Sequence, residues 1–555
     1  MKRILLAILI VYVVIVGFDS CKKKVPLNVR YWKVSGSGFQ YPEISDPEFK
    51  YPPILNRPNY GICFSGGGTV SASLITGYLK ALEELKLMGN FRYISGVSGG
   101  TWGSAPYCFL PGDISDDLFL GAKYLPEDLT QDILNRDPQG SMIHAVTNAR
   151  IIDLTLKNIL YTHEAYTRAV GEIFLKPFGI DYDKRYFITN QDAVAKIIAR
   201  NSQLTPDDFV TLRPDRPFLI MNATFFLPIS NPLISRTYQI CPFEFTPLYS
   251  GLKPREPSTG ICDQVIGGFF VESFGFDTTL MEAEGVIASV TPGRNRFALC
   301  EPVGTSGEAV EGIAVKWAPF ATLPFPQFNY WNLSDPASNG THKYNFGDGG
   351  ILEDTGVTAL LRRRVECMAV FLTNPFDTEN PIDPNDKNEM TERYYGYNQV
   401  ACLFGQPIYN TQPGHDFGKL ITDPYQRTVF DPVQFEELKN QLQTSKKTGG
   451  PIFASGTYSV QSNEMFGVEG SWSCRIIWMC VDTCTDFNRR LPSSIGEQIG
   501  QPGELQDFPV VKVFYQNKRY VIQLTPVQAN MLGNFAYWMV KDKQQDFLDL
   551  FLTYK

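Results

Sequence analysis

Histidine is scarce in this sequence, with four residues among 555: His144, His163, His342 and His415. Any site that relies on an imidazole therefore has few candidates. Neither these histidines nor the 11 cysteines form a convincing set at the spacing of zinc ligands. We therefore expect no bound metal and no cofactor.

Basic residues are not in excess either. The chain carries 50 Lys and Arg against 58 Asp and Glu, a net charge of −8 and a pI near 5.3. A surface that binds nucleic-acid phosphates needs the opposite balance. We expect no nucleic-acid partner.

An apolar stretch near the N-terminus, Ile4–Phe18, has 15 residues, which is short for a membrane-spanning helix. Lys2 and Arg3 precede it, as in an export signal, and Cys21 follows it. We predict that residues 1–24 are an export signal or a membrane anchor, with Cys21 as a candidate lipoprotein cysteine. The protein is therefore expected to be membrane-attached or secreted.

The rest of the chain can build a sizeable core, since 43% of its residues are hydrophobic and 13% aromatic. Residues 25–58 are rich in proline and aromatic side chains and are predicted to be a surface tether. Residues 59–555 are predicted to form the main domain. Apolar runs at 217–226 and 365–372 predict buried strands within it.

Two parts of this domain have helical patterns. Residues 111–215 lack the alternation of apolar and polar residues that is typical of strands, and segments 141–160 and 192–202 have helical patterns. This predicts an inserted helical cap. Residues 527–552 have an amphipathic pattern. We expect that pattern to pack on the core rather than lie on a membrane surface.

A first glycine motif follows an apolar run, 61–64, that is typical of a buried strand. The motif consists of Gly66, Gly67 and Gly68, and a helical pattern comes directly after it. Glycine N–H groups can approach an oxyanion closely because no Cβ intervenes. A phosphate-binding loop would need Lys followed by Ser or Thr, and a dinucleotide loop would need a third spaced glycine; neither is present.

The second glycine motif has the G-x-S-x-G pattern of a nucleophile elbow between a strand and a helix. It reads Gly96-Val97-Ser98-Gly99-Gly100 and follows a short apolar run at 91–94. Such an elbow forces its serine into a strained backbone conformation that exposes the hydroxyl. The two motifs in succession predict a hydrolase in which Ser98 is the nucleophile. The N–H groups of Gly66, Gly67, Gly68 and Gly99 would form its oxyanion hole.

Asp348 is the candidate base, in the segment Gly347-Asp348-Gly349-Gly350 that precedes the strand-like run at 365–372. It could accept the Ser98 proton directly if burial keeps its pKa high enough. A Ser-His-Asp esterase in hydrolase order would instead use a histidine after the aspartate, which leaves His415. Both alternatives stay open at this point.

These motifs resemble the catalytic domain of the cytosolic phospholipase A2 family, within the patatin-like lipid acyl hydrolases. The resemblance is carried by Ser65-Gly66-Gly67-Gly68, by the stretch from Gly96 to Trp102 and by Gly347-Asp348-Gly349-Gly350, and it covers about residues 59–375. It implies an α/β fold with a central mixed sheet and an inserted helical cap. It also implies a phospholipase A2 or lysophospholipase that cleaves carboxylic esters of glycerophospholipids at a membrane surface. Ser98 and Asp348 would form a dyad acting through an acyl-enzyme.

The sequence departs from the family at Val70, where members usually have an arginine that meets the substrate phosphate. This departure makes a lipid-binding protein with a decayed site one alternative. Independently of Val70, acyl transfer to an acceptor other than water also stays open. Only about 35 residues separate the N-terminal signal from the core. This leaves no room for the calcium-dependent lipid-binding domain that precedes some of these enzymes.

Val70 generates a first prediction about substrates. A charged contact to phosphate contributes about 1.5–3 kcal/mol, and valine cannot make it. Phospholipids should therefore have little advantage over neutral esters of equal chain length. The measurement is kcat/KM on a matched pair of a lysophospholipid and a monoacylglycerol. A preference for the phospholipid above about tenfold would show that another residue binds the phosphate.

Overall fold

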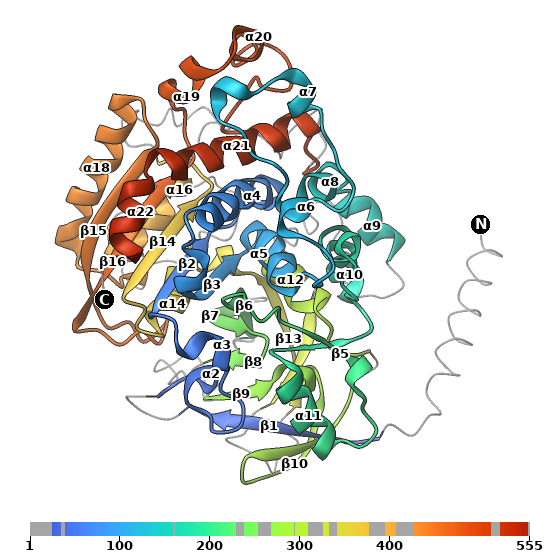
Figure 1. Cartoon of the computed structure of the whole chain (residues 1–555). Helices are drawn as coiled ribbons and strands as arrows, with labels where there is room; N and C mark the ends of the chain where they lie inside the picture. The colour runs from blue at the N-terminus through green and yellow to red at the C-terminus, as the bar shows by residue number, and fades with distance from the viewer. Residues whose placement is uncertain are drawn as a thin grey trace, which may run out of the picture.

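The computed structural model describes residues 25–34, 39–158, 163–228, 238–252, 268–293, 295–308, 326–331, 341–376, 395–406, 427–511 and 522–552. Within these residues the chain is a mixed α/β protein, built on a large central sheet with helices packed over it (Figure 1). The α/β class and the mixed sheet expected from the sequence are confirmed. Residues 1–24 and His415 lie outside the described residues.

The strands are β1 Leu27–Lys33, β2 Tyr60–Phe64, β3 Phe91–Val97, β4 Tyr186–Ile188, β5 Phe209–Thr211, β6 Phe218–Pro228, β7 Tyr238–Phe245, β8 Tyr249–Leu252, β9 Phe269–Glu272, β10 Thr279–Glu284, β11 Ile287–Thr291, β12 Gln327–Trp331, β13 Thr341–Asp348, β14 Cys367–Leu372, β15 Ile452–Val460 and β16 Trp472–Cys480.

The α-helices are α2 Pro42–Ser45, α3 Pro52–Leu55, α4 Gly68–Glu84, α5 Gly99–Phe109, α6 Asp116–Leu120, α7 Gln131–Leu134, α8 Met142–Thr147, α9 Ile151–Lys157, α10 Ala165–Phe174, α11 Gln191–Arg200, α12 Cys300–Ser306, α14 Val357–Leu361, α16 Tyr395–Ala401, α18 Phe435–Thr448, α19 Thr485–Arg490, α20 Ser493–Gly496, α21 Pro526–Asp542 and α22 Gln544–Phe551.

The large sheet has the strand order β10-β11-β1-β9-β8-β7-β6-β3-β2-β14-β16-β15, with β13 also pairing to β6. Its centre is parallel, because β3 runs parallel to both β6 and β2, and β14 runs parallel to both β2 and β16. Every residue of β2 and β14 is buried. Strands covered on both faces read as continuous apolar runs, which is the pattern in the sequence.

The parallel strands are covered on one side by α4 and α21, which cross closely (Figure 1). A Cβ at Gly77 of α4 would overlap the carbonyl oxygen of Gly533 in α21, so glycine permits the backbone contact. Residues 527–552 thus pack on the core as expected, and they form two helices, α21 and α22, rather than one. In the second helix, the ring of Phe547 stacks on Phe371 of β14.

Residues 111–215, predicted to be a helical cap, contain the helices α6 to α11 and a separate two-stranded sheet of β4 and β5. The segment 141–160 is divided into α8 and α9, and the segment 192–202 corresponds to α11. Within the described residues, no helix is long and apolar enough to cross a membrane. The nine described cysteines are buried and form no disulfide.

The segment 25–58 differs from the expected surface tether. Its β1 lies inside the large sheet, antiparallel to β11 and β9. The reason is an alternation of side chains in which Leu27, Val29 and Tyr31 are buried. Glu43 in α2 is also fully buried.

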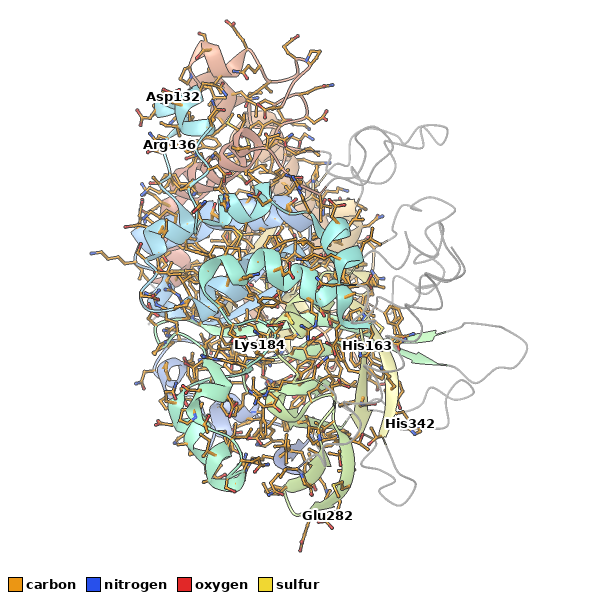
Figure 2. The ribbon with its side chains drawn as sticks, turned by 90° about the vertical axis from the view of Figure 1, so that its right-hand side faces the viewer. Asp132, Arg136, His163, Lys184, Glu282 and His342 are labelled. Carbon is orange, nitrogen blue, oxygen red and sulfur yellow. The ribbon has the colours of Figure 1, made fainter. Side chains whose placement is uncertain are left out.

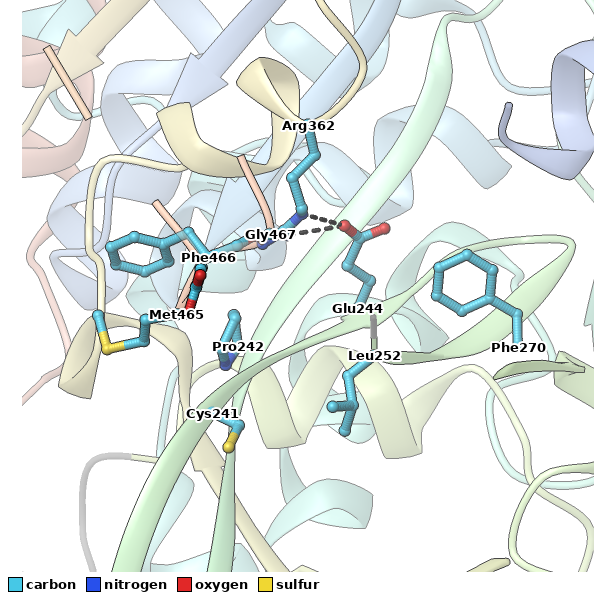
Figure 3. A pocket seen from close by; sticks show the side chains of 10 residues that line it. Cys241, Pro242, Glu244, Leu252, Phe270, Arg362, Met465, Phe466 and Gly467 are labelled. Carbon is cyan, nitrogen blue, oxygen red and sulfur yellow. Dashed lines mark hydrogen bonds and ion pairs between the residues drawn. The ribbon is translucent and has the colours of Figure 1, made fainter. Parts of the chain in front are cut away.

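A buried ion network ties this N-terminal segment to the core. Arg363, two residues after the end of α14, contacts Glu43 at 3.0 Å and Glu244 of β7 at 2.6 Å. Arg362 contacts Oε1 of the same Glu244 carboxylate at 2.6 Å (Figure 3). The cavity drawn in Figure 3, which Glu244 and Arg362 help to line, is about 20 Å³, space for a single water molecule.

Arg363 generates a prediction about stability. Arg363→Met would leave Glu43 and Glu244 buried with one guanidinium fewer, and removing one partner of a buried pair costs about 3–5 kcal/mol. The free energy of unfolding from urea titration should fall by that amount. The control is Arg364→Met, because the Arg364 side chain is 58% exposed and its ion pair with Glu469 should contribute less than about 1 kcal/mol. Equal losses in the two variants would contradict this role for the network.

Candidate active site

The glycine loop predicted from the sequence connects the end of β2 to the start of α4. Gly67 is the residue before the helix and has φ of 130°, and Gly68 begins the helix with φ of 57°. Residues with a side chain rarely adopt these angles, so the turn into α4 requires glycine here. The loop therefore ends at a helix N-terminus, where backbone N–H groups have no partner within the helix.

Ser98 lies at the turn between β3 and α5, as a nucleophile elbow requires. Its backbone has φ of 52° and ψ of −123°, a conformation that is unusual for a residue with a side chain. The turn is packed against the glycine loop, since a Cβ at Gly99 would overlap the backbone of Gly68. The two glycine motifs are therefore in direct backbone contact.

Two further segments hold the elbow in place. The Ser98 N–H donates to the carbonyl oxygen of Ser306 at 3.0 Å and lies 3.1 Å from the Ser306 hydroxyl. That hydroxyl donates to the carbonyl oxygen of Asn222 at 2.7 Å. The end of α12 and strand β6 thus anchor the strained backbone, and sequence reasoning did not identify either residue.

Asp348 reaches Ser98 from the end of β13, which pairs antiparallel with β6. The Ser98 hydroxyl donates to Oδ2 of Asp348 at 2.7 Å. The other carboxylate oxygen, Oδ1, accepts the N–H of Gly350 at 2.8 Å. The structure therefore brings together the serine and the aspartate that the two motifs marked.

Burial controls the charge of Asp348, whose side chain is almost completely enclosed. Burial raises the pKa of Asp348 to about 7, although the hydrogen bonds from Gly350 and Ser98 act in the opposite direction. A carboxyl with a pKa near neutrality can hold a proton in one step of a reaction and release it in another.

The four N–H groups expected to form an oxyanion hole are not equivalent. The Gly66 N–H donates to the carbonyl oxygen of Asp354 at 3.2 Å, so it is already engaged. Gly68 and Gly99 each occupy the first position of a helix, and Gly67 precedes α4. Their N–H groups are the ones that helix geometry leaves open.

The described histidines lie apart from this pair. His144 contacts Asp137 at 3.1 Å, and His163 contacts Lys343 at 3.4 Å. His163 and His342 lie on the same side of the molecule in Figure 2. No histidine of the described ranges hydrogen-bonds to Ser98 or Asp348.

Val70 lies in the first turn of α4 and is buried, with 6% of its surface exposed. Its side chain belongs to the hydrophobic core. An isopropyl group in that position can donate no hydrogen bond to a phosphate. As for metals, the part of the chain that the structure describes contains no group of three or more His, Cys, Asp or Glu placed to hold an ion.

No protein-family model and no curated protein matches the sequence. Among solved structures, human GIVD cytosolic phospholipase A2 is similar with a TM-score of 0.41 and 13% identity over 90% of this chain and 62% of that chain. Its complex with methyl gamma-linolenyl fluorophosphonate and terbium chloride gives a TM-score of 0.34, with 14% identity over 89% of this chain and 59% of that one. Its complex with methyl gamma-linolenyl fluorophosphonate gives a TM-score of 0.34, with 12% identity and the same coverage.

The chain therefore spans 59–62% of the length of the solved chains that it matches. Similarities at this level carry no conclusion about activity. What the structure defines is a class of site: a serine on a strained strand-to-helix turn, hydrogen-bonded to a buried carboxyl, beside a glycine loop at a helix N-terminus.

The raised pKa of Asp348 generates a prediction about stability and pH. In the unfolded chain the carboxyl titrates near 3.8 and in the folded chain near 7, so the folded state holds the extra proton between these values. Stability from this group is therefore lost as the pH rises through that range. Asp348→Asn, which is neutral throughout, should therefore gain stability relative to the native protein as the pH rises, by roughly 2–3 kcal/mol between pH 5 and pH 8.

Urea unfolding at the two pH values measures this difference. The exposed Asp546→Asn variant is the control, and its effect should be the same at both pH values. An effect of Asp348→Asn that does not change between pH 5 and pH 8 would contradict a pKa near 7.

Proposed function

We propose that this protein is a lipid acyl hydrolase that cleaves carboxylic esters of glycerophospholipids or lysophospholipids. The observation that carries the proposal is the 2.7 Å hydrogen bond from the Ser98 hydroxyl to the buried Asp348 carboxyl. The lipid substrate is supported by the pairing of Ser65-Gly66-Gly67-Gly68 with the motif around Ser98, which resembles the cytosolic phospholipase A2 family.

In this mechanism Ser98 attacks the ester carbonyl while Asp348 accepts the hydroxyl proton. The ester carbon becomes tetrahedral, and its oxygen gains a negative charge. The N–H groups of Gly67, Gly68 and Gly99 are available to stabilise that charge, with the start of α4 behind them. The alcohol then leaves with the proton from Asp348, and the acyl group stays on Ser98.

The second half of the reaction uses the same carboxylate. Asp348 takes a proton from water, which attacks the acyl carbonyl and releases the fatty acid, and the proton returns to Ser98. The carboxylate form of Asp348 is the base, so activity should increase as the pH rises through about 7. At the membrane, residues 1–24 are proposed to export or anchor the enzyme.

A fluorophosphonate probe that labels activated serines tests the proposal. The native protein should be labelled at Ser98 and should hydrolyse lysophospholipids in a lipid panel. Ser98→Ala should abolish labelling, and both Ser98→Ala and Asp348→Asn should lower kcat by at least about 10³-fold. Ser445→Ala, on α18, is the matched serine control and should label like the native protein.

His415→Ala separates the dyad from a Ser-His-Asp esterase. The dyad needs no imidazole, so this variant should keep most of the activity. A loss as large as that of Ser98→Ala would replace the dyad by the histidine mechanism. A native protein that binds lipid but is neither labelled nor active would be a lipid-binding protein instead.

A further inference from the structure

Asp354 is a second buried carboxyl beside the proposed site, six positions after Asp348 in the sequence. Only 4% of its surface is exposed. It lies in the connection between β13 and α14, and its carbonyl oxygen accepts the N–H of Gly66 at 3.2 Å. This hydrogen bond joins the glycine loop to the segment that carries Asp348.

The Asp354 side chain lies directly against two glycines. A Cβ placed on Gly66 would overlap Oδ1 of Asp354, and a Cβ placed on Gly350 would overlap the same oxygen. Gly350 is the residue whose N–H holds Oδ1 of Asp348 at 2.8 Å. One carboxyl group thus touches the glycine loop on one side and the peptide that orients Asp348 on the other.

The third side of the carboxyl is held by α16. Nε2 of Gln399 donates to Oδ2 of Asp354, and Gln399 is itself 8% exposed. The side chain of Asp354 is therefore fixed by a long-range contact rather than by its own loop. Its position cannot change without displacing the amide of Gln399 or one of the two glycines.

The charges around Asp354 favour its neutral form. Burial raises the pKa of Asp354 well above its ordinary range, and the neighbouring carboxyls Asp348 and Glu353 raise it further. Two adjacent buried carboxyls do not ionise together at neutral pH. The one bonded to Ser98 can therefore serve as the base while the other stays protonated.

We infer that Asp354 is a positioning residue, which holds the glycine loop and the Asp348 carboxyl at the separation that hydrolysis needs. The inference rests on the proposed function. Among the described residues no hydrogen bond joins Asp354 to Ser98, so it acts through Gly66 and Gly350. A displacement of about 1 Å in such a site can cost about 100-fold in rate.

The test compares Asp354→Ala with Asp354→Asn on a soluble p-nitrophenyl ester, with kcat expressed per fluorophosphonate-labelled site. Asp354→Ala should lower kcat about 10- to 100-fold and change KM less than about threefold, because ground-state binding is not affected. In the pH–rate profile of Asp354→Ala, the apparent pKa of the acidic limb should be lower than in the native protein. The reason is that water entering the space left by the side chain reduces the desolvation of Asp348. Asp354→Asn keeps the shape and the neutral charge of the side chain. Its kcat should stay within about threefold of the native value, and the apparent pKa of its pH–rate profile should not change.

Asp46→Ala is the matched control. Asp46 is buried to a similar extent and caps backbone N–H groups of Glu48 and Phe49, far from Ser98 in the sequence. It should lower stability and leave kcat unchanged. If Asp354→Ala does not fold, Gln399→Leu provides the second variant, with a smaller loss of kcat expected because Asp354 stays in place.

Hydrogen exchange of the glycine loop makes the inference independent of activity. Amides in residues 66–68 and 348–350 should exchange faster in Asp354→Ala than in the native protein and in Asp46→Ala. If the native protein neither reacts with the fluorophosphonate nor hydrolyses the ester, the proposed function is wrong. Amide hydrogen exchange would then still decide whether Asp354 positions the glycine loop. Unchanged kcat and exchange in Asp354→Ala, or an Asn variant as impaired as the Ala variant, would overturn the inference.

Discussion

Close approach of backbone segments is the constraint on which the candidate site depends. The turn at Ser98 contacts the glycine loop through Gly99 and Gly68, and it contacts the end of β2 through Gly100, where a Cβ would overlap the carbonyl oxygen of Phe64. A side chain at any of these contacts would separate the segments. The glycines therefore determine how near open N–H groups can come to the Ser98 hydroxyl.

Burial has opposite consequences at two places in this fold. Asp348 is buried with hydrogen-bond donors, no arginine of the described residues contacts it, and its pKa rises to about 7. Burial also acts on Glu244, but Arg363 and Arg362 outweigh it and lower the pKa of that carboxyl. The same desolvation thus yields a titratable base in one position and a permanent structural anion in the other.

The ends of the described chain complete the scaffold around the parallel strands. At one end, β1 extends the large sheet and Glu43 enters the network of Arg363. At the other, α21 and α22 cover α4 and the sheet. The turn that carries Ser98 therefore follows β3, a strand with all but one residue buried, which is what a preorganised site requires.

Local patterns in the sequence determined the elements nearest to Ser98. The apolar runs, the glycines and the helical spacing specified β2, the glycine loop, α4, β3 and the elbow, because each depends on neighbours a few residues away. The sequence also marked Asp348 by its glycine-rich context. The interpretation of residues 25–58 as a tether was wrong because pairing with β9 and β11 decides whether that segment is a strand.

The tertiary structure alone decided which groups meet. Ser98 and Asp348 are 250 positions apart, and Ser306, which holds the Ser98 N–H, is 208 positions away from it. Asp354 and Gln399 lie in no motif that signals their contact. Hydrogen bonds between residues so far apart leave no periodicity in the sequence, since they arise only when strands and loops are brought to the same edge of the sheet.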